Sequence, residues 1–171
     1  FDNSRRLIYS SNHKETSCPK QTEKLGVLVA FGQSNSANYA EHLFEPKDLK
    51  NVFNYFKGKC YAARSPLLGA DGAKGEWMSL TASNLIKNGV YEKIIIVSSG
   101  IGDTSIKLWA KGNYLNKMFI EVITNLSKEY SITDFIFHQG EADKKTYGYV
   151  YEFYFKTLIE TIRNVEANAP I

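Results

Sequence analysis

Residues 25–35 read Leu-Gly-Val-Leu-Val-Ala-Phe-Gly-Gln-Ser-Asn, a continuous apolar run that stops at a glycine followed by polar side chains. The run from Leu25 to Phe31 is too short for an ordinary helix and contains two valines, which favours a β-strand. A strand without polar alternation is typical of a sheet that is covered on both faces. The polar residues Gly32–Asn35 therefore stand at the end of a central strand.

Outward from this strand, strand-like and helix-like patterns alternate along the chain. We expect further short strands, rich in Ile, Val and Phe, at residues 52–56, 93–98 and 134–138. Apolar residues at helical spacing indicate helices near residues 77–88, 115–126 and 151–165. Because strands that alternate with helices form βαβ units, the sequence predicts a three-layer α/β/α sandwich with a mainly parallel sheet.

The size and composition of the chain are those of one ordinary globular domain. Its 171 residues are 43% hydrophobic and 23% charged, with a formal net charge of +3. This small, scattered excess lacks the electrostatic signature of a nucleic-acid-binding protein. No apolar run approaches the ~20 residues of a membrane-spanning helix. We therefore expect neither a nucleic-acid partner nor a membrane-spanning segment, and the oligomeric state stays open.

Residues 1–22 are polar and show no periodic pattern, so we interpret them as an N-terminal arm ahead of a single domain over residues 23–171. Cys18 and Cys60 are 42 positions apart and lack the spacing of a zinc site. Two interpretations stay open: two unrelated thiols, or one disulfide that ties the arm to the body. The disulfide would imply an oxidising compartment, and a secreted or periplasmic location is the one we favour.

The unusual polar residues of the chain gather after the expected strands. In open parallel sheets, ligands bind at the carboxyl ends of the strands. Three polar segments occupy such positions: Gly32–Asn35, Gly100–Ser105 and His138–Asp143. The sequence therefore predicts that these three segments meet in one functional site.

Ser34 is the candidate nucleophile of that site. It directly follows a buried strand and is expected to begin a helix, where free backbone N–H groups and the helix dipole stabilise negative charge. Acyl transfer needs both a nucleophile and a site for the oxyanion. A helix N-cap is the alternative interpretation, because serine is among the favoured capping residues.

Gly102 follows the strand at 93–98 and also has two interpretations. Gly100 and Gly102 half-match the dinucleotide-binding fingerprint, but Ser105 stands where the third glycine belongs. We interpret Gly102 instead as a backbone N–H brought close to a substrate, where a side chain would block the approach. A simple turn is the alternative.

The third segment combines an imidazole with two carboxylates. Glu141 and Asp143 lie on the same side of an extended segment, which alone is weak evidence for paired-carboxylate glycoside chemistry. His138 closes a strand, and we expect it to be a core or supporting residue rather than a general base. No group of His or Cys has metal-ligand spacing, so we expect no metal and no cofactor.

Taken in order, residues 32–35, residues 102–106 with Trp109, and residues 138–143 resemble the successive blocks of a known family. This family is the sialate O-acetylesterase-like branch of the SGNH hydrolase superfamily, which includes carbohydrate esterase family six. Residues 64–72, followed by Trp77, are similar to its substrate-side loop. The resemblance extends from about residue 25 to 171. It implies a flavodoxin-like fold and a serine esterase that removes O-acetyl or similar acyl groups from carbohydrate through an acyl-serine intermediate.

The resemblance also implies roles for single residues. Ser34 matches the nucleophile, and the backbone N–H groups of Ser34 and Gly102 match oxyanion donors. Gln139 stands where other SGNH enzymes place an oxyanion asparagine, and Glu141 resembles a carboxylate that organises the site. Asp103 departs from the family, which usually has a second glycine there, and we expect it to narrow or charge the pocket.

The triad acid and base of the family come from an Asp-x-x-His motif near the C-terminus. None of His13, His42 and His138 has an aspartate three positions earlier. We expect that residues 1–171 lack the C-terminal part of the fold and are nearly inactive alone; the alternatives are that His138 substitutes or that the protein is inactive. Two functions therefore stay open: an ester hydrolase, and a non-catalytic carbohydrate-binding or scaffold domain on the same fold.

Overall fold

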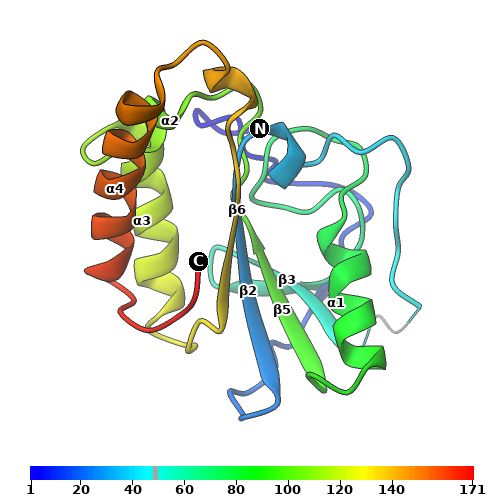
Figure 1. Cartoon of the computed structure of the whole chain (residues 1–171). Helices are drawn as coiled ribbons and strands as arrows, with labels where there is room; N and C mark the ends of the chain where they lie inside the picture. The colour runs from blue at the N-terminus through cyan, green and yellow to red at the C-terminus, as the bar shows by residue number, and fades with distance from the viewer. Residues whose placement is uncertain (48–49) are drawn as a thin grey trace.

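The fold is organised around one six-stranded sheet, seen in a computed structural model that describes residues 1–47 and 50–171. The strands lie in the order β1-β4-β3-β5-β2-β6 (Figure 1). Strands β3, β5, β2 and β6 run parallel. Strand β4 pairs antiparallel with β3, and β1 pairs antiparallel with β4 at one edge of the sheet. In chain order the strands are β1 (Glu15–Thr16), β2 (Leu25–Gly32), β3 (Val52–Phe56), β4 (Lys59–Ala62), β5 (Lys93–Ser98) and β6 (Asp134–His138).

Helices cover both faces of the sheet, which confirms the predicted three-layer α/β/α sandwich. Helix α1 (Met78–Lys87) lies on one face, and α2 (Ile106–Trp109), α3 (Tyr114–Leu126) and α4 (Gly148–Arg163) lie on the other (Figure 1). Two single turns of 3₁₀ helix, η1 (Ser34–Ser36) and η2 (Glu141–Asp143), follow β2 and β6. Across residues 1–47 and 50–171, none of the helices has the length and apolar character needed to cross a bilayer.

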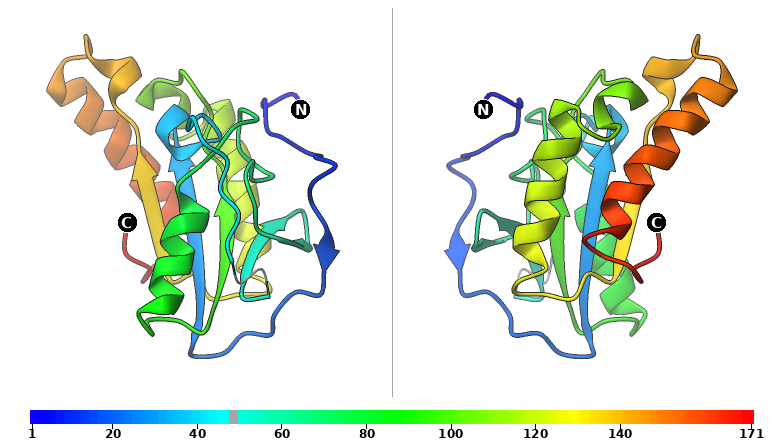
Figure 2. Two further views of the ribbon diagram at one scale, coloured as in Figure 1. Left: turned by 90° about the vertical axis from the view of Figure 1, so that its right-hand side faces the viewer. Right: turned by 90° about the vertical axis from the view of Figure 1, so that its left-hand side faces the viewer.

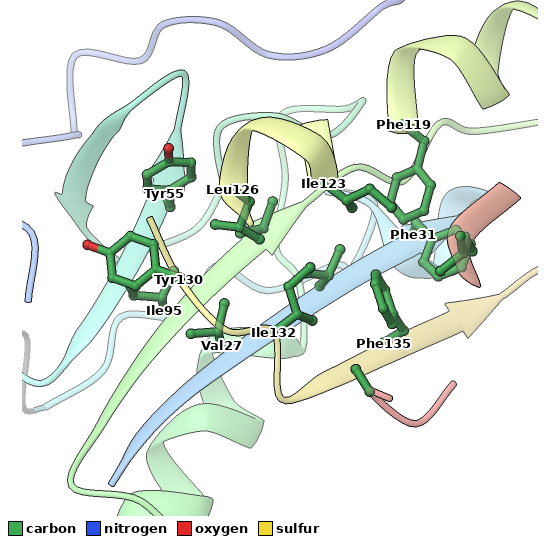
Figure 3. Packing of buried hydrophobic residues seen from close by; sticks show 14 of the residues in the cluster. Val27, Phe31, Tyr55, Ile95, Phe119, Ile123, Leu126, Tyr130, Ile132 and Phe135 are labelled. Atoms are coloured by element: carbon green, nitrogen blue, oxygen red, sulfur yellow. The ribbon is translucent and has the colours of Figure 1, made fainter. Parts of the chain in front are cut away.

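The side chains of β2 alternate between two hydrophobic cores. Val27, Val29 and Phe31 pack into the cluster that contains α3 and α4, whereas Leu28 and Ala30 pack into the cluster that contains α1. Phe31 stacks on Phe119 of α3 with ring centroids 4.2 Å apart (Figure 3). All of these side chains are buried, so the central strand is covered on both faces as expected.

The N-terminal arm is attached to the sheet rather than loose. Strand β1 pairs with β4, and Cys18 forms a disulfide with Cys60, so the disulfide interpretation is confirmed. Leu7 adds two backbone hydrogen bonds, donating to the Ala70 carbonyl at 2.7 Å and accepting from the Gly69 N–H at 2.9 Å. The N-terminus consequently lies at the end of the sheet where the parallel strands finish (Figure 2).

The helix expected to begin at Ser34 is only one 3₁₀ turn long. Only the three-residue turn η1 forms, and Ala37 is already extended. The buried side chain of Asn38 explains the change, because it accepts the Leu67 N–H at 2.7 Å and donates to the Leu67 carbonyl at 2.9 Å. These bonds and the bridge between Asn38 and Gly72 hold the chain against the 67–75 loop instead of letting it coil.

Candidate active site

The three polar segments predicted to meet do form one site at the carboxyl end of the sheet. An open cavity of about 280 Å³ lies there. The sheet contributes Gln33 and Ser34 after β2, Gly102 and Asp103 after β5, and Glu141 and Ala142 after β6. Two further residues complete the lining, Arg5 from the arm and Tyr39 from the segment after η1.

Ser34 owes its position to the close contact between the ends of β2 and β6. The Gln33 N–H donates to the His138 carbonyl at 2.9 Å. Gly32 has a φ of +124°, and a Cβ there would lie 2.1 Å from the same carbonyl oxygen, so only glycine fits. The strand can therefore turn sharply into η1, and half-buried Ser34 faces the cavity.

The buried amide of Gln33 ties η2 to the end of β2. Its Oε1 accepts the Ala142 N–H at 3.0 Å and lies 3.4 Å from Nε2 of Gln139. Glu141 stands next to Ala142 and accepts a hydrogen bond from the Asn35 side chain. The segments after β2 and β6 are thus linked on both sides of Ser34.

Of the two roles expected for His138, core or supporting residue, the core role is wrong. Its side chain is 50% exposed, and Nε2 lies 3.3 Å from Oε1 of Glu141. Gln139, by contrast, turns inward, where its Nε2 donates to the Thr104 carbonyl at 2.9 Å and also to Asp143. Gln139 therefore lies behind the cavity and is not among the residues that line it.

The backbone of Gly102 is bonded on both sides. Its N–H donates to Oδ2 of Asp71 at 3.1 Å, and its carbonyl accepts a hydrogen bond from the Arg5 guanidinium. A Cβ on Gly102 would lie 2.9 Å from the Tyr39 hydroxyl and 3.0 Å from its ring. A side chain would therefore displace Tyr39 from the cavity wall, which explains the small residue at this position.

Asp71 is the buried charge on which this wall depends. Only 7% of the residue is exposed. Besides Gly102, it accepts the Gly72 N–H at 2.8 Å and pairs with Arg5 at 3.4 Å. Burial raises the pKa of Tyr39, and the hydrogen bond and negative charge of Asp71 raise it further. Tyr39 therefore stays a neutral hydroxyl at ordinary pH.

Arg5, Tyr39 and Asp71 were not singled out from the sequence. Arg5 has a φ of +63°, unusual for a residue with a side chain. The Asp2 carboxylate stabilises this turn by accepting the N–H groups of Ser4 and Arg6, each at 3.0 Å. The Asp-x-Ser signature of such a turn at residues 2–4 was the signal available for Arg5, and for Asp71 it was the resemblance of residues 64–72 to the substrate-side loop.

The site offers side chains for acyl chemistry but not for metal binding. In the described part of the chain, no group of three or more His, Cys, Asp or Glu side chains is arranged to hold a metal ion. The cavity carries one cation, Arg5, and two carboxylates, Asp103 and Glu141. Of the groups that a serine hydrolase site needs, this cavity holds a serine hydroxyl, backbone amides and carboxylates.

A structural comparison supports the fold. A protein from Arabidopsis thaliana, solved by X-ray crystallography, superposes with a TM-score of 0.61 at 15% sequence identity. The match covers 82% of this chain and 68% of that one. At this identity the likeness shows a shared fold and nothing about activity.

Sequence comparisons assign the family. Curated proteins give no significant match. A family model described as carbohydrate esterase, sialic acid-specific acetylesterase matches residues 24–170. This match covers nearly all of the chain, and the predicted resemblance is confirmed. The chain therefore belongs to the sialic acid-specific acetylesterase family of carbohydrate esterases.

Proposed function

We propose that the protein is a serine esterase that hydrolyses O-acetyl or similar small acyl esters of carbohydrate, with Ser34 as the nucleophile. The observation that carries this proposal is the presence of Ser34, Gly102 and Glu141 in one open cavity at the carboxyl end of the sheet. The carbohydrate esterase family supports the choice of a sugar ester as substrate.

In the proposed reaction, Oγ of Ser34 attacks the acyl carbon while its proton passes to a general base. The backbone N–H groups of Ser34 and Gly102 donate to the oxyanion of the tetrahedral intermediate. Collapse of the intermediate breaks the ester bond, and the departing sugar hydroxyl takes the proton back from the base. Water then attacks the acyl-serine by the same steps, which releases the carboxylic acid and restores Ser34.

Two of the proposed oxyanion donors already have partners in the structure. The Gly102 N–H donates to Asp71, so in the reaction it must be shared between that carboxylate and the substrate or exchanged between them. Gln139 Nε2 donates to the Thr104 carbonyl, and its amide must turn before it can donate into the cavity. We therefore assign the main oxyanion role to the two backbone groups and a secondary one to Gln139.

The general base is proposed to be the histidine of an Asp-x-x-His motif outside residues 1–171. His138 is the second candidate, because its Nε2 lies 3.3 Å from Oε1 of Glu141. A carboxylate that holds an imidazole in one orientation is the arrangement that supports a base in serine hydrolases. Glu141 would then orient His138 as well as Asn35.

The test is acetate release from acetylated sugars by the protein carried to its natural C-terminus. Ser34→Ala is expected to lower turnover by about 10³-fold or more, because nucleophile and base act as a unit. Ser127→Ala is the matched control, since Ser127 is exposed after α3 and lies outside the cavity. Retention of more than about a tenth of the activity by Ser34→Ala would assign the chemistry to another residue.

A non-catalytic carbohydrate-binding domain is the second candidate function. The observation in its favour is that the Gly102 N–H is already bonded to Asp71. Sugar binding without any acetate release from that same protein would support this second function and overturn the first.

A further inference from the structure

A second and larger cavity lies on the other side of β5 from Ser34. Its volume is about 450 Å³, within the range of roughly 300–1,000 Å³ that is usual for small-molecule sites. It opens at the carboxyl ends of β3 and β5, between these strands and α3, under the turn Lys57-Gly58 that leads into β4. It shares no lining residue with the cavity of Ser34.

The floor of this second cavity is apolar apart from a buried hydroxyl. Tyr55 and Val97 are 5% and 2% exposed, and both belong to the hydrophobic core that faces α3. Ser99 is two residues after Val97 and four after Ile95, so its side chain points to the same face of the sheet as theirs. Ser99 is 1% exposed. Its hydroxyl lines the cavity. A hydroxyl on this otherwise apolar floor can donate a hydrogen bond to a ligand hydroxyl or accept one from it.

The wall formed by α3 presents a row of hydrogen-bonding groups. Glu121, Asn125 and Lys128 recur at intervals of four and three residues, so they share one side of the helix and its C-terminal turn. Lys128 Nζ donates to Oδ1 of Asn125 at 2.8 Å, which orients both side chains. Across the cavity, the Tyr55 hydroxyl donates to Oε1 of Glu129 at 3.0 Å. Donors and acceptors are therefore held in place before any ligand arrives.

The ionic groups around the mouth balance one another. Arg6 is already paired with Asp2 at 2.8 Å. The remaining ions at the mouth are equal in number and opposite in sign: Lys57 and Lys128 against Glu121 and Glu129. A mouth without net charge does not select an ion, whereas closely spaced ammonium, amide and carboxylate groups match hydroxyls that both donate and accept.

We propose that this second cavity is a binding site for a neutral sugar, a mono- or disaccharide whose ring rests on Tyr55 and Val97 and whose hydroxyls bond Ser99 and the α3 row. The site does not depend on hydrolysis at Ser34, so it stands whether or not the protein is an esterase. At this site the protein binds a carbohydrate separately from the ester substrate at Ser34.

The test is an NMR titration of the isotope-labelled protein with cellobiose, followed through the backbone amides. Cellobiose is expected to shift the amides of Lys57, Ser99 and Val122, with glucosamine and glucuronate binding at least about fivefold more weakly. Ser99→Val is expected to weaken cellobiose binding by about five- to tenfold, as the loss of one hydrogen bond predicts. Val122→Trp, which fills the cavity from α3, is expected to abolish it.

Controls separate this site from the cavity of Ser34. Ser34→Ala is expected to leave the cellobiose shifts unchanged, and Ser99→Val is expected to leave acetyl-ester turnover unchanged. If Val122→Trp fails to fold, Ser99→Val alone decides. The proposal is overturned if cellobiose does not shift these amides, or if the Ser99→Val variant binds cellobiose as tightly as the wild type. It is also overturned if glucosamine or glucuronate binds as tightly as cellobiose.

Discussion

The Asp71 carboxylate accepts the backbone N–H of Gly102 at 3.1 Å across the wall of the cavity that contains Ser34. The same carboxylate pairs with Arg5, so the loop after β5 and the N-terminal arm are anchored on one buried charge. The direction in which the Gly102 N–H points, on which the proposed oxyanion site depends, is consequently set by a residue of the 67–75 loop.

Asp71→Ala should lower the free energy of unfolding by about 1–3 kcal/mol, because two backbone N–H groups lose their acceptor and Arg5 loses its partner. Asp71→Asn should cost less, since an amide oxygen still accepts an N–H. Urea denaturation measures both values. Asp103→Asn is the control, because Asp103 is exposed and asparagine tolerates its φ of +53°. Equal stability of the wild type and Asp71→Ala would contradict the anchoring role.

His138→Ala should reduce turnover less than tenfold in the protein carried to its natural C-terminus, because the expected base lies elsewhere. Residues 1–171 alone should show less than about 1% of that turnover, as expected of a serine without its base. Both are measured as acetate release from an acetylated sugar. Strong activity of residues 1–171 that His138→Ala destroys would identify His138, oriented by Glu141, as the base.

Glu76→Gln should make the fold less sensitive to pH. Burial raises the pKa of Glu76 above its usual 4.5, although Ser79 and Ser65 donate hydrogen bonds to its carboxylate. The folded state therefore binds this proton more tightly than the unfolded state, and stability falls as the pH rises from about 4.5 through the raised pKa.

The measurement is the difference in unfolding free energy between Glu76→Gln and the wild type, taken at several pH values. Glutamine keeps an acceptor for the Ser79 N–H and carries no charge, so the variant should gain relative to the wild type across that window. A difference that stays constant from pH 4 to pH 7 would show that burial does not shift this group.

Phe31→Ala should lower the free energy of unfolding by about 3–5 kcal/mol, because it opens a cavity where the ring stacks on Phe119 at the centre of the larger core. Phe153→Ala, on the exposed side of α4 where the ring is 62% exposed, should change it by about 0.5 kcal/mol or less. Chemical denaturation of both variants gives the comparison, and similar losses would contradict the assignment of the core.

The four parallel strands could be predicted because each is a short run rich in apolar residues; β2, β3 and β5 are almost fully buried, and β6 is partly buried. Strands β1 and β4 could not. Glu15–Thr16 is too short and too polar to show the alternation of a strand. Lys59–Ala62 follows β3 so closely that its sequence indicates a turn rather than a strand. Strand β1 belongs to the arm, which the disulfide holds in place beside β4.

The candidate site was predictable only where it follows a strand. Ser34, Gly102 and Glu141 come directly after buried strands, so the rule for parallel sheets brings them together. Arg5 and Asp71 come from segments without periodicity, and they reach the cavity through hydrogen bonds between residues far apart in the chain. The helix expected at Ser34 ends after one turn for the same reason, because the Asn38 side chain forms hydrogen bonds with Leu67, which is far away in the chain.

The disulfide between Cys18 and Cys60 turns residues 18–60 into a covalent ring that contains β2, Ser34 and β3. Within that ring, residues 41–43 form an exposed segment of the kind that proteases cut first. A single cut there breaks the backbone, but the two pieces stay together because the disulfide still joins them. The nicked protein would migrate as one band without reductant and as two bands with it, and the strand that carries Ser34 would stay joined to the rest of the sheet.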